Sequence, residues 1–399
     1  MNAVQRRPVA TLLLIIVVVL LALQIIGVYR GWRIVLVGFA GVLLVGRIWA
    51  GRLRRGLGLE QQVQFGWYEV GDRVLSRIAL TNESRFPALW VEINDRSTLP
   101  SASPNRGVTV AGKGQRRWLK EAICTRRGLF TLGPMSLTSG DPFGLYTARL
   151  DYPDIVPFLV MPQVVSLPAI QVAAGGRASE GRVRNDAPEE TVISTSAREY
   201  QPGDALRWIH WPTTVRRDEL FVRRFDGAPS GDWWIVLDAD LDVQVGSGDD
   251  STLEHGVILA ASLADRGLRA GRSVGLAAAD QELIWLPPKG SEAHRWQIMR
   301  SLALLSYGSH ALGELLPMLR PNSTRTSLVI ITPAVDTSWI EALIPLMNRG
   351  DVPTVLLLDP RSFGGPGEST EAVSTLSDLG VAHYQIDRSL LGDPVPAGT

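Results

Sequence analysis

Two apolar runs near the N-terminus constrain the fold of this chain more than any other feature. Residues 9–28 contain only three polar or glycine interruptions, and residues 34–50 contain one charged residue, Arg47, near their end. A bilayer core about 30 Å thick needs roughly 20 apolar residues in a helix. We therefore expect residues 1–56 to form a transmembrane hairpin, with helices over about 9–28 and 32–50.

A cleaved signal peptide is the alternative interpretation of the first run, because Arg6 and Arg7 resemble its charged start. The run is too long for a signal peptide, however, and no small-residue cleavage site follows it. The pattern therefore favours a retained anchor in the lipid bilayer.

Arginines flank the two runs unequally, with six at the ends of the hairpin and two in its connection. The positive-inside rule then places both ends, and the rest of the chain, in the cytoplasm. Cys124 is the only cysteine, which agrees with a reducing compartment. The arginines at the ends are Arg6, Arg7, Arg47, Arg52, Arg54 and Arg55, and those in the connection are Arg30 and Arg33.

Length and charge limit what the remainder can be. A chain of 399 residues is long enough for two or more domains besides the hairpin. Its formal net charge is zero, which argues against a nucleic-acid-binding protein. A single cysteine also excludes an internal disulfide.

Residues 57–168 have the pattern of a β-rich domain. Apolar and polar side chains alternate over short runs such as 74–80 and 89–94, and Gly- and Pro-containing turns separate the runs. Such spacing predicts an antiparallel, β-sandwich-like domain. The sequence DPFGLY at 141–146 is expected to be a turn with Phe143 and Leu145 directed inward.

Residues 169–230 are predicted to be a linker followed by a charged segment, and residues 231–388 a doubly wound α/β domain. In this domain, strands and helices alternate, and two consecutive strands are expected to form a hairpin that gives the sheet one antiparallel edge. The tail, 389–399, is predicted to be loose. The expected strands are 233–237, 273–279, 282–286, 328–331, 354–358 and 382–386, and the expected helices are 252–269, 293–305, 339–347 and 371–379.

Acidic residues follow the first α/β strand. In sheets of this class, ligands bind beyond the carboxyl ends of the strands, where the strand order reverses. Asp238, Asp240 and Asp242 lie at such an end, and Thr332 and Asp336 follow a later strand. Their oxygens suit a divalent cation. Alternatively, these carboxylates cap helix N-termini and pair with arginines.

The segment 197–225, AREYQPGDALRWIHWPTTVRRDELFVRRF, is the most distinctive part of the sequence. It contains six arginines and four acidic residues. It resembles the signature of the family called domain of unknown function 58, and the order of elements after it is similar to a von Willebrand factor A domain. DPFGLY also resembles the segment that precedes the signature in that family. The residues at matching spacing are Arg198, Tyr200, Pro202, Gly203, Asp204, Arg207, Ile209, Trp211, Arg216 and Leu220.

The resemblance implies a membrane-anchored protein of a prokaryotic plasma membrane that acts with a MoxR-type AAA ATPase or its client. Two departures matter. Residues 212–215 read Pro-Thr-Thr-Val, where a lysine and small residues are usual. Asp240 and Asp242 replace the two serines of the factor A-type cation motif, so the resemblance implies at most a weak, degenerate metal site.

Two interpretations of the signature residues remain open. Pro202 and Gly203 permit a tight turn in which Asp204 bonds backbone amides. Arg198 and Arg207 offer bidentate donors to carboxylates. The segment is then either a structural strap with buried Arg–Asp pairs or a partner-facing patch, because Arg and Trp dominate interface hot spots. On the first interpretation, Trp211 packs against the α/β sheet.

Signs of catalysis are few. His210 has no nucleophile elbow near it, and the chain lacks a Walker-type phosphate loop. The sequence therefore predicts a non-catalytic membrane-anchored scaffold or adaptor that binds a protein partner and needs no cofactor. The alternative is a metal-dependent hydrolase that uses Asp238, Asp240 and Asp242.

Overall fold

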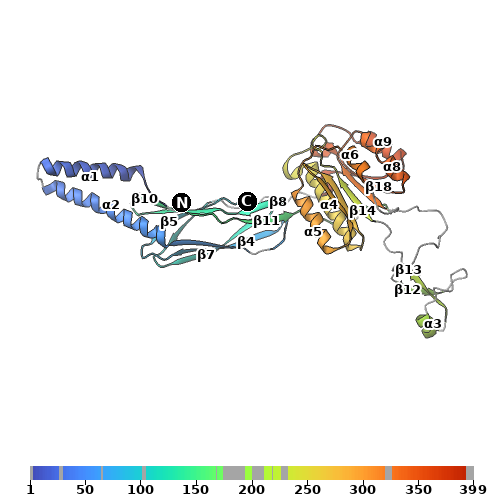
Figure 1. The fold of residues 1–399 in the computed structure, drawn as a ribbon, viewed down its shortest axis with the longest axis horizontal. Coiled ribbons are helices and arrows are strands. Elements are labelled where there is room, and N and C mark those ends of the chain that lie inside the picture. The colour runs from blue at the N-terminus through green and yellow to red at the C-terminus, as the bar shows by residue number, and fades with distance from the viewer. Residues whose placement is uncertain are drawn as a thin grey trace. The chain divides into compact units, whose positions relative to one another are not determined.

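The described residues of the computed structural model form two compact units, Met1–Gln163 and Val164–Gly392 (Figure 1). The helical hairpin and the β-rich domain belong to the same unit. The structure describes residues 3–26, 30–63, 66–100, 105–167, 169–173, 194–199, 211–217, 219–225, 232–319 and 326–391.

The first unit begins with a strand, β1 (Ala3–Arg6), and two long helices, α1 (Pro8–Ile26) and α2 (Arg30–Gly56). Both helices are long and apolar enough to cross a membrane, and they form a hairpin. α2 continues six residues beyond the predicted end at 50, because its last turns pack on the β-rich domain. Leu53 there is fully buried.

Several sheets follow the hairpin, and their strand pairs are antiparallel except for one. One sheet has the order β2-β4-β7, a second β1-β10-β9-β5-β6, and a third β3-β11-β8, in which β3 and β11 are parallel. The strands are β2 (Leu57–Val63), β3 (Tyr68–Glu69), β4 (Arg73–Asn82), β5 (Ala88–Asp95), β6 (Asn105–Val110), β7 (Gln115–Ile123), β8 (Gly128–Leu132), β9 (Met135–Gly140), β10 (Tyr146–Tyr152) and β11 (Val156–Met161).

The core of this unit lies between the first two sheets. Ile78 and Leu80 of β4 pack in one buried cluster with Val91 of β5, Leu137 of β9 and Leu150 of β10. Every second side chain of β4 is buried, as the period of a strand requires. The β-rich pattern of the sequence is confirmed as several antiparallel sheets.

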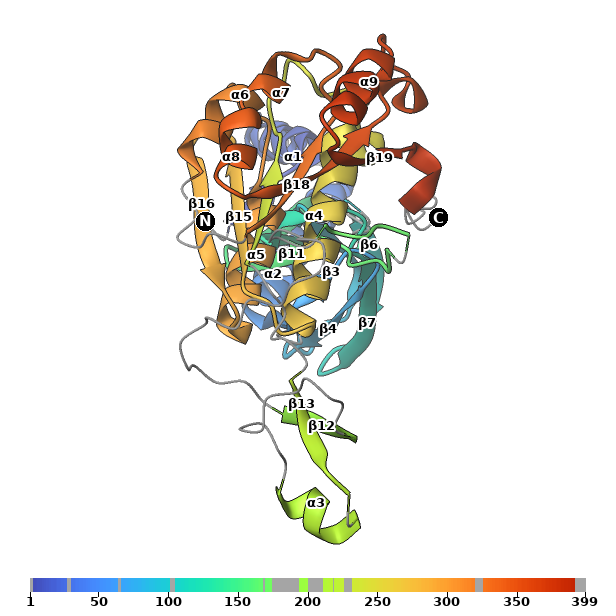
Figure 2. The same cartoon turned by 90° about the vertical axis from the view of Figure 1, so that its right-hand side faces the viewer.

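The second unit contains a six-stranded mixed sheet with the order β16-β15-β14-β17-β18-β19 (Figure 2). All neighbours are parallel except β15 and β16, which form the expected hairpin edge. The strands are β14 (Trp233–Leu237), β15 (Val274–Ala279), β16 (Leu283–Lys289), β17 (Ser327–Thr332), β18 (Val352–Leu358) and β19 (Ala382–Ile386).

Helices cover both faces of this sheet. α4 (Thr252–Arg269) packs on β14, β15 and β17, and α5 (Glu292–Leu304) packs beside α4. Gly256 lets α4 approach closely, since a Cβ there would lie 2.9 Å from Leu237 Cδ1. The opposite face is covered mainly by α6 (Leu312–Leu315), α7 (Ser338–Glu341) and α9 (Thr370–Asp378). Shorter segments are α8 (Ile344–Asn348), η2 (Gly248–Asp250), η3 (Leu316–Met318), η4 (Pro360–Phe363) and η5 (Arg388–Leu391).

One predicted helix is divided in the structure. The helix expected over 339–347 is formed by α7 and α8 with a break between them. Pro345 explains the break, because proline has no N–H for the intrahelical hydrogen bond and clashes with the preceding turn.

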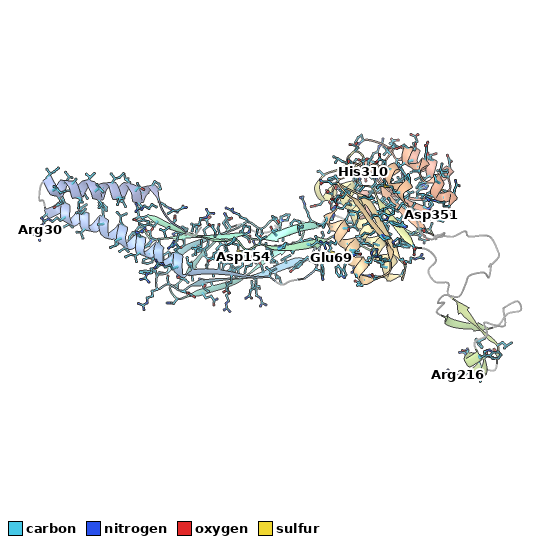
Figure 3. The ribbon with its side chains drawn as sticks, in the orientation of Figure 1. Arg30, Glu69, Asp154, Arg216, His310 and Asp351 are labelled. Carbon is cyan, nitrogen blue, oxygen red and sulfur yellow. The ribbon has the colours of Figure 1, made fainter. Side chains whose placement is uncertain are left out.

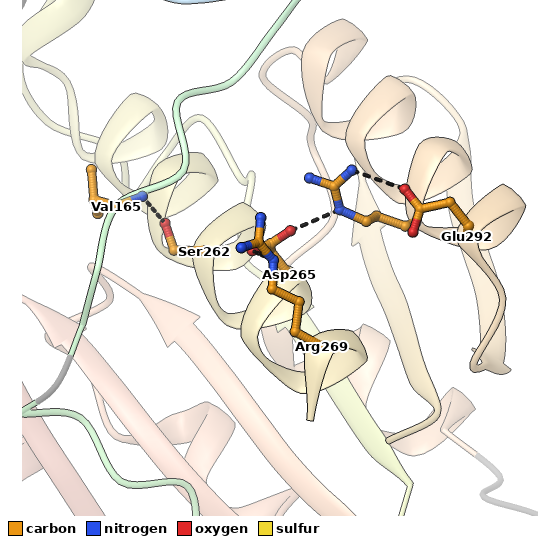
Figure 4. Close-up of polar contacts among 6 residues, drawn as sticks. Val165, Ser262, Asp265, Arg269 and Glu292 are labelled. Carbon is orange, nitrogen blue, oxygen red and sulfur yellow. Dashed lines mark hydrogen bonds and ion pairs between the residues drawn. The ribbon is translucent and has the colours of Figure 1, made fainter. Parts of the chain in front are cut away.

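Polar contacts tie α4 to its neighbours (Figure 4). Asp265 accepts a hydrogen bond from Arg295 of α5 at 2.7 Å and pairs with Arg269 at 2.8 Å. The Ser262 hydroxyl accepts the backbone N–H of Val165 at 2.9 Å. The chain entering the second unit is therefore fixed on α4, although the predicted linker begins only a few residues later.

A separate hairpin carries the described part of the signature. β12 (Ser194–Glu199) pairs antiparallel with β13 (Phe221–Phe225), and α3 (Trp211–Arg217) lies between them in the sequence.

Candidate functional site

The acidic site lies where the sheet order reverses. The chain leaves β14 for β15 on one side and returns to β17 on the other, so the ends of β14 and β17 are adjacent. Asp238 and Thr332 follow these two strands, and the Thr332 hydroxyl donates to Asp238 Oδ2 at 2.6 Å. The sequence placed both residues at strand ends, and the structure shows that the two strands are neighbours.

Asp238 is almost fully buried, with 1% of its surface exposed. Burial raises the pKa of its carboxyl to about 6, and the nearby charges of Asp240 and Asp336 act in the same direction. Hydrogen bonds from Thr332 and from the Asp240 backbone oppose this rise in pKa. The second of these bonds reaches Asp238 Oδ1 at 3.1 Å, so both carboxylate oxygens have partners.

The other predicted metal ligands, Asp240 and Asp336, accept hydrogen bonds from residues in their own turns. Asp240 Oδ1 accepts the backbone N–H of Asp242 at 3.2 Å, and Asp242 itself is exposed. Asp336 accepts from the backbone and hydroxyl of Ser338. Within the described ranges, no group of three or more His, Cys, Asp or Glu side chains is placed to share a metal ion. This arrangement does not fit a divalent cation, and binding at Asp238, Asp240 and Asp242 stays a prediction.

Two further residues complete the polar network around Asp238, and sequence analysis missed both. The Gln244 side chain donates to the Asp238 backbone carbonyl at 2.8 Å, and the Thr252 hydroxyl donates to Gln244 Oε1 at 2.6 Å. Thr252 begins α4, whereas Ser251 is the residue that caps this helix. No motif identifies a glutamine in a loop, so only the structure could find it.

The second candidate surface is on α3. Trp211 and Val215 are separated by one helical turn and are 62% and 78% exposed. Arg216, which Figure 3 labels, and Arg217 belong to the same helix and are also exposed. This exposure agrees with the partner-facing interpretation of the signature, and packing of Trp211 against the sheet stays a prediction. Apolar and cationic side chains lie together on α3.

Contacts inside the hairpin hold α3 in place. The Thr214 hydroxyl accepts the backbone N–H of Phe221 at 3.0 Å. The guanidinium of Arg217 lies 5.4 Å from the centre of the Phe221 ring, within the range of a cation–π interaction. The start of β13 therefore fixes the orientation of the helix.

Most of the remaining signature residues lie outside the described parts of the chain, among them Tyr200, Pro202, Gly203, Asp204 and Arg207. Arg198 lies on β12, where it pairs with Val222 of β13 in the backbone register. The choice between a strap and a partner patch for these six residues stays a prediction.

The DPFGLY turn joins the helical hairpin to the β-rich domain. Asp141 is buried and accepts the backbone N–H groups of Phe143 and Tyr146 at 2.9 and 2.5 Å. Leu145 and Tyr146 pack in one cluster with side chains of both long helices, Ala10, Leu43 and Ala50. Leu145 is directed inward as predicted, but Phe143 is 51% exposed.

Comparison with known proteins identifies proteins that are similar to this chain. Residues 196–374 match the model of the family described as protein of unknown function DUF58. The uncharacterized protein YeaD of Bacillus subtilis is 24% identical over 249 residues, which is 59% of this chain and 58% of YeaD. The uncharacterized protein Rv1480 of Mycobacterium tuberculosis is 24% identical over 204 residues, 49% of this chain and 64% of Rv1480. The chain thus spans about three fifths of these curated relatives.

Among solved structures, the CARDB domain of the PF1109 protein from Pyrococcus furiosus is similar to part of this chain, and the match covers 27% of this chain and 96% of that domain. The sequence identity is 9% and the TM-score is 0.20, so this similarity carries no argument about function.

Proposed function

Residues 196–374 belong to the DUF58 family, and from that premise we propose that the chain is a membrane-anchored, non-catalytic scaffold that binds a protein partner. By its resemblance, the partner is a MoxR-type AAA ATPase or the client of that ATPase, in the assembly or maturation of a protein complex. The two long helices form the anchor, in the plasma membrane of a prokaryote, with the rest of the chain in the cytoplasm.

The exposed face of α3 is the observation that carries this proposal. Adjoining apolar side chains that are open to solvent mark interaction sites when they form a patch. Trp211 and Val215 do so, and Arg216 and Arg217 adjoin them. Tryptophan and arginine are the residues on which binding energy at protein interfaces concentrates. α3 also lies inside the segment that identifies the family.

The architecture supports the finer assignment of each domain. A mixed sheet with one antiparallel edge and helices on both faces favours a von Willebrand factor A-like domain for residues 231–388. Two sheets that share one core favour a β-sandwich-like domain for residues 57–168. In both domains, fold alone does not imply a reaction.

A metal-dependent hydrolase has less support. Such an enzyme needs carboxylates that converge on a cation with open coordination positions. Both oxygens of Asp238 already accept hydrogen bonds, and Asp242 is exposed. We therefore assign the acidic cluster a structural role at the end of β14.

Partner capture from membranes tests the proposal. The full chain, extracted in detergent from its own host, should retain a MoxR-type ATPase, and the double variant Trp211→Ser, Val215→Ser should lose most of it. Losing an interface tryptophan typically costs about 2 kcal/mol or more, roughly a 30-fold loss of affinity. Leu241→Ser, another exposed apolar residue of the second unit, is the matched control. Equal capture by the wild type and the double variant would reject α3 as the partner surface.

A further inference from the structure

A basic cavity of about 680 Å³ lies where α2 meets the turns of the β-rich domain. Arg52 and Arg55 line it from the last turns of α2. Arg85, from the turn after β4, and Lys113, from the turn between β6 and β7, line it from the domain. Glu83 is the only acidic residue in the lining. Four positive charges therefore face one negative charge.

The four cationic side chains are available to a ligand. Arg52, Arg55, Arg85 and Lys113 are all exposed. Among the residues that the structure describes, none of the four is in an ion pair. Like charges gathered without counter-charges repel one another, so an anion in the cavity would be stabilised.

The turns that carry Arg85 and Lys113 are held rigidly by the protein. Asn82 is 1% exposed, and its side-chain amide donates to the carbonyls of Phe86 at 2.9 Å and Ala111 at 3.1 Å. The backbone N–H of Lys113 donates to the Ser84 carbonyl at 2.8 Å. A site with a fixed backbone loses less entropy when it binds a ligand.

Lys113 has an unusual backbone conformation. Its φ of 56° makes it the only non-glycine residue with positive φ in the described parts of the chain. Glycine would occupy this left-handed conformation without the steric cost that a lysine incurs. A strained residue retained at a surface turn points to a function of its side chain.

The position of the cavity along α2 suggests which anion binds. About 20 residues of α2, from Arg30 to Trp49, span about 30 Å, the thickness of the hydrocarbon core. The Trp49 ring lies 4.7 Å from the Phe86 ring, and its N–H donates to the Pro87 carbonyl at 3.2 Å. Tryptophan prefers the membrane–water interface. With α2 as the proposed anchor, Arg52, one turn beyond Trp49, would lie at the level of the lipid headgroups.

We propose that this cavity binds the phosphate headgroup of an anionic phospholipid from the leaflet next to the β-rich domain. Basic pockets beside transmembrane helices bind such headgroups. The inference rests on the proposed membrane anchor and adds a specific lipid site to it. Bound lipid would bridge α2 and the β-rich domain and fix the domain against the membrane surface.

The test uses the full chain in nanodiscs of phosphatidylcholine, with and without phosphatidylglycerol. We expect phosphatidylglycerol to raise the melting temperature and to co-purify with the protein in native mass spectrometry. Each basic residue near the surface contributes about 1 kcal/mol, so removing one should weaken retention of the lipid about fivefold. The double variant Arg85→Gln, Lys113→Gly should weaken it roughly 25-fold by the same rule.

Two features make the result decisive. Lys113→Gly relieves the backbone conformation, so loss of lipid by this variant cannot be attributed to misfolding. Arg96→Gln removes an exposed arginine just beyond the other end of β5 and should retain the lipid.

The controls separate three failures. A wild-type protein released from membranes by carbonate would refute the anchor itself. A membrane-embedded protein with no preference for phosphatidylglycerol, or an unchanged double variant, would overturn only the lipid site. Stabilisation by inorganic phosphate in neutral detergent, equal to that by phosphatidylglycerol, would identify a free anion as the ligand and would also overturn it.

Discussion

Asp238 contributes to the pH dependence of the stability of the second unit. Its pKa is raised in the folded state to about 6 from an ordinary value of 3.8. Between these two pH values, the folded protein therefore holds a proton on this carboxyl that the unfolded chain has already released. Its contribution to stability is therefore present in full below pH 4 and is lost as the pH rises through 6. The difference is about 3 kcal/mol at 1.36 kcal/mol per pKa unit.

Asp238→Asn tests this assignment, because an amide keeps the shape of the side chain but does not titrate. We expect the variant to be more stable than the wild type near neutral pH and to lose this advantage near pH 4. Thermal melts of both proteins across this range measure the effect. Parallel pH profiles would contradict the assignment and would show that Asp238 is ionised throughout.

Removal of divalent cations tests the acidic cluster as a whole. Asp238 and Asp240 form local hydrogen bonds, and Asp242 is exposed. We therefore expect EDTA to leave the melting temperature of the protein unchanged. A large drop that added Mg²⁺ reverses would mean that these three aspartates do hold a metal ion.

Single residues were the hardest level to predict from sequence. Asp238 and Thr332 could each be placed at the end of a strand, but only the strand order shows that the two strands are neighbours. Gln244 could not be predicted, because its contact depends on how one loop folds back. The sequence left open whether Trp211 packs on the sheet or faces a partner, because arginine and tryptophan suit both roles.

At the scale of elements, Gly46 determines how α2 fits the DPFGLY turn. A Cβ at this position would lie 3.2 Å from both Asp141 Oδ2 and Tyr146 Cδ2. We expect Gly46→Val to destabilise the first unit by about 1–3 kcal/mol, the usual cost of overpacking. Gly41→Val is the matched control on the same helix, since nothing lies within 4 Å of a Cβ there. Equal melting of the two variants in detergent would show that α2 is not seated on the turn.

The contact between α4 and α5 depends on one ion pair. The side chains of Asp265 and Arg295 are 6% and 15% exposed, and burial of Asp265 makes loss of its partner costly. Arg295→Met should lower stability by up to about 3 kcal/mol, because the buried Asp265 then keeps only the exposed Arg269 as its partner. Glu292→Gln removes an exposed partner of the same arginine and should cost less than about 1 kcal/mol. Denaturant melts that ranked the two variants equally would contradict this account.

Sequence patterns predicted elements better than residues. The strands and helices of the second unit follow from continuous apolar runs and from the turns between them, and α4 begins at Thr252 as expected. The short strand β1 was missed, because four residues before a helix carry no period. The true end of α2 was missed, because its last turns are stabilised by the β-rich domain and not by a membrane.

At the scale of the whole molecule, the anchor and the β-rich domain act as one body. β1 pairs with β10 just before α1 begins, and α2 passes directly into β2. Both ends of the helical hairpin therefore attach to the same domain, which requires them to be on the same side of a membrane. The side itself follows only from the arginine bias. The proposed ATPase partner needs ATP, so the account requires that side to be the cytoplasm.

Protease protection in intact cells tests this central claim most directly. Protease added to sealed spheroplasts should leave the full-length chain intact, and the same protease should digest it after the membrane is permeabilised. A periplasmic protein of known location must be digested in both samples as a control. Digestion of the chain in sealed spheroplasts would place residues 57–391 outside the cytoplasm and would contradict a scaffold for a cytoplasmic ATPase.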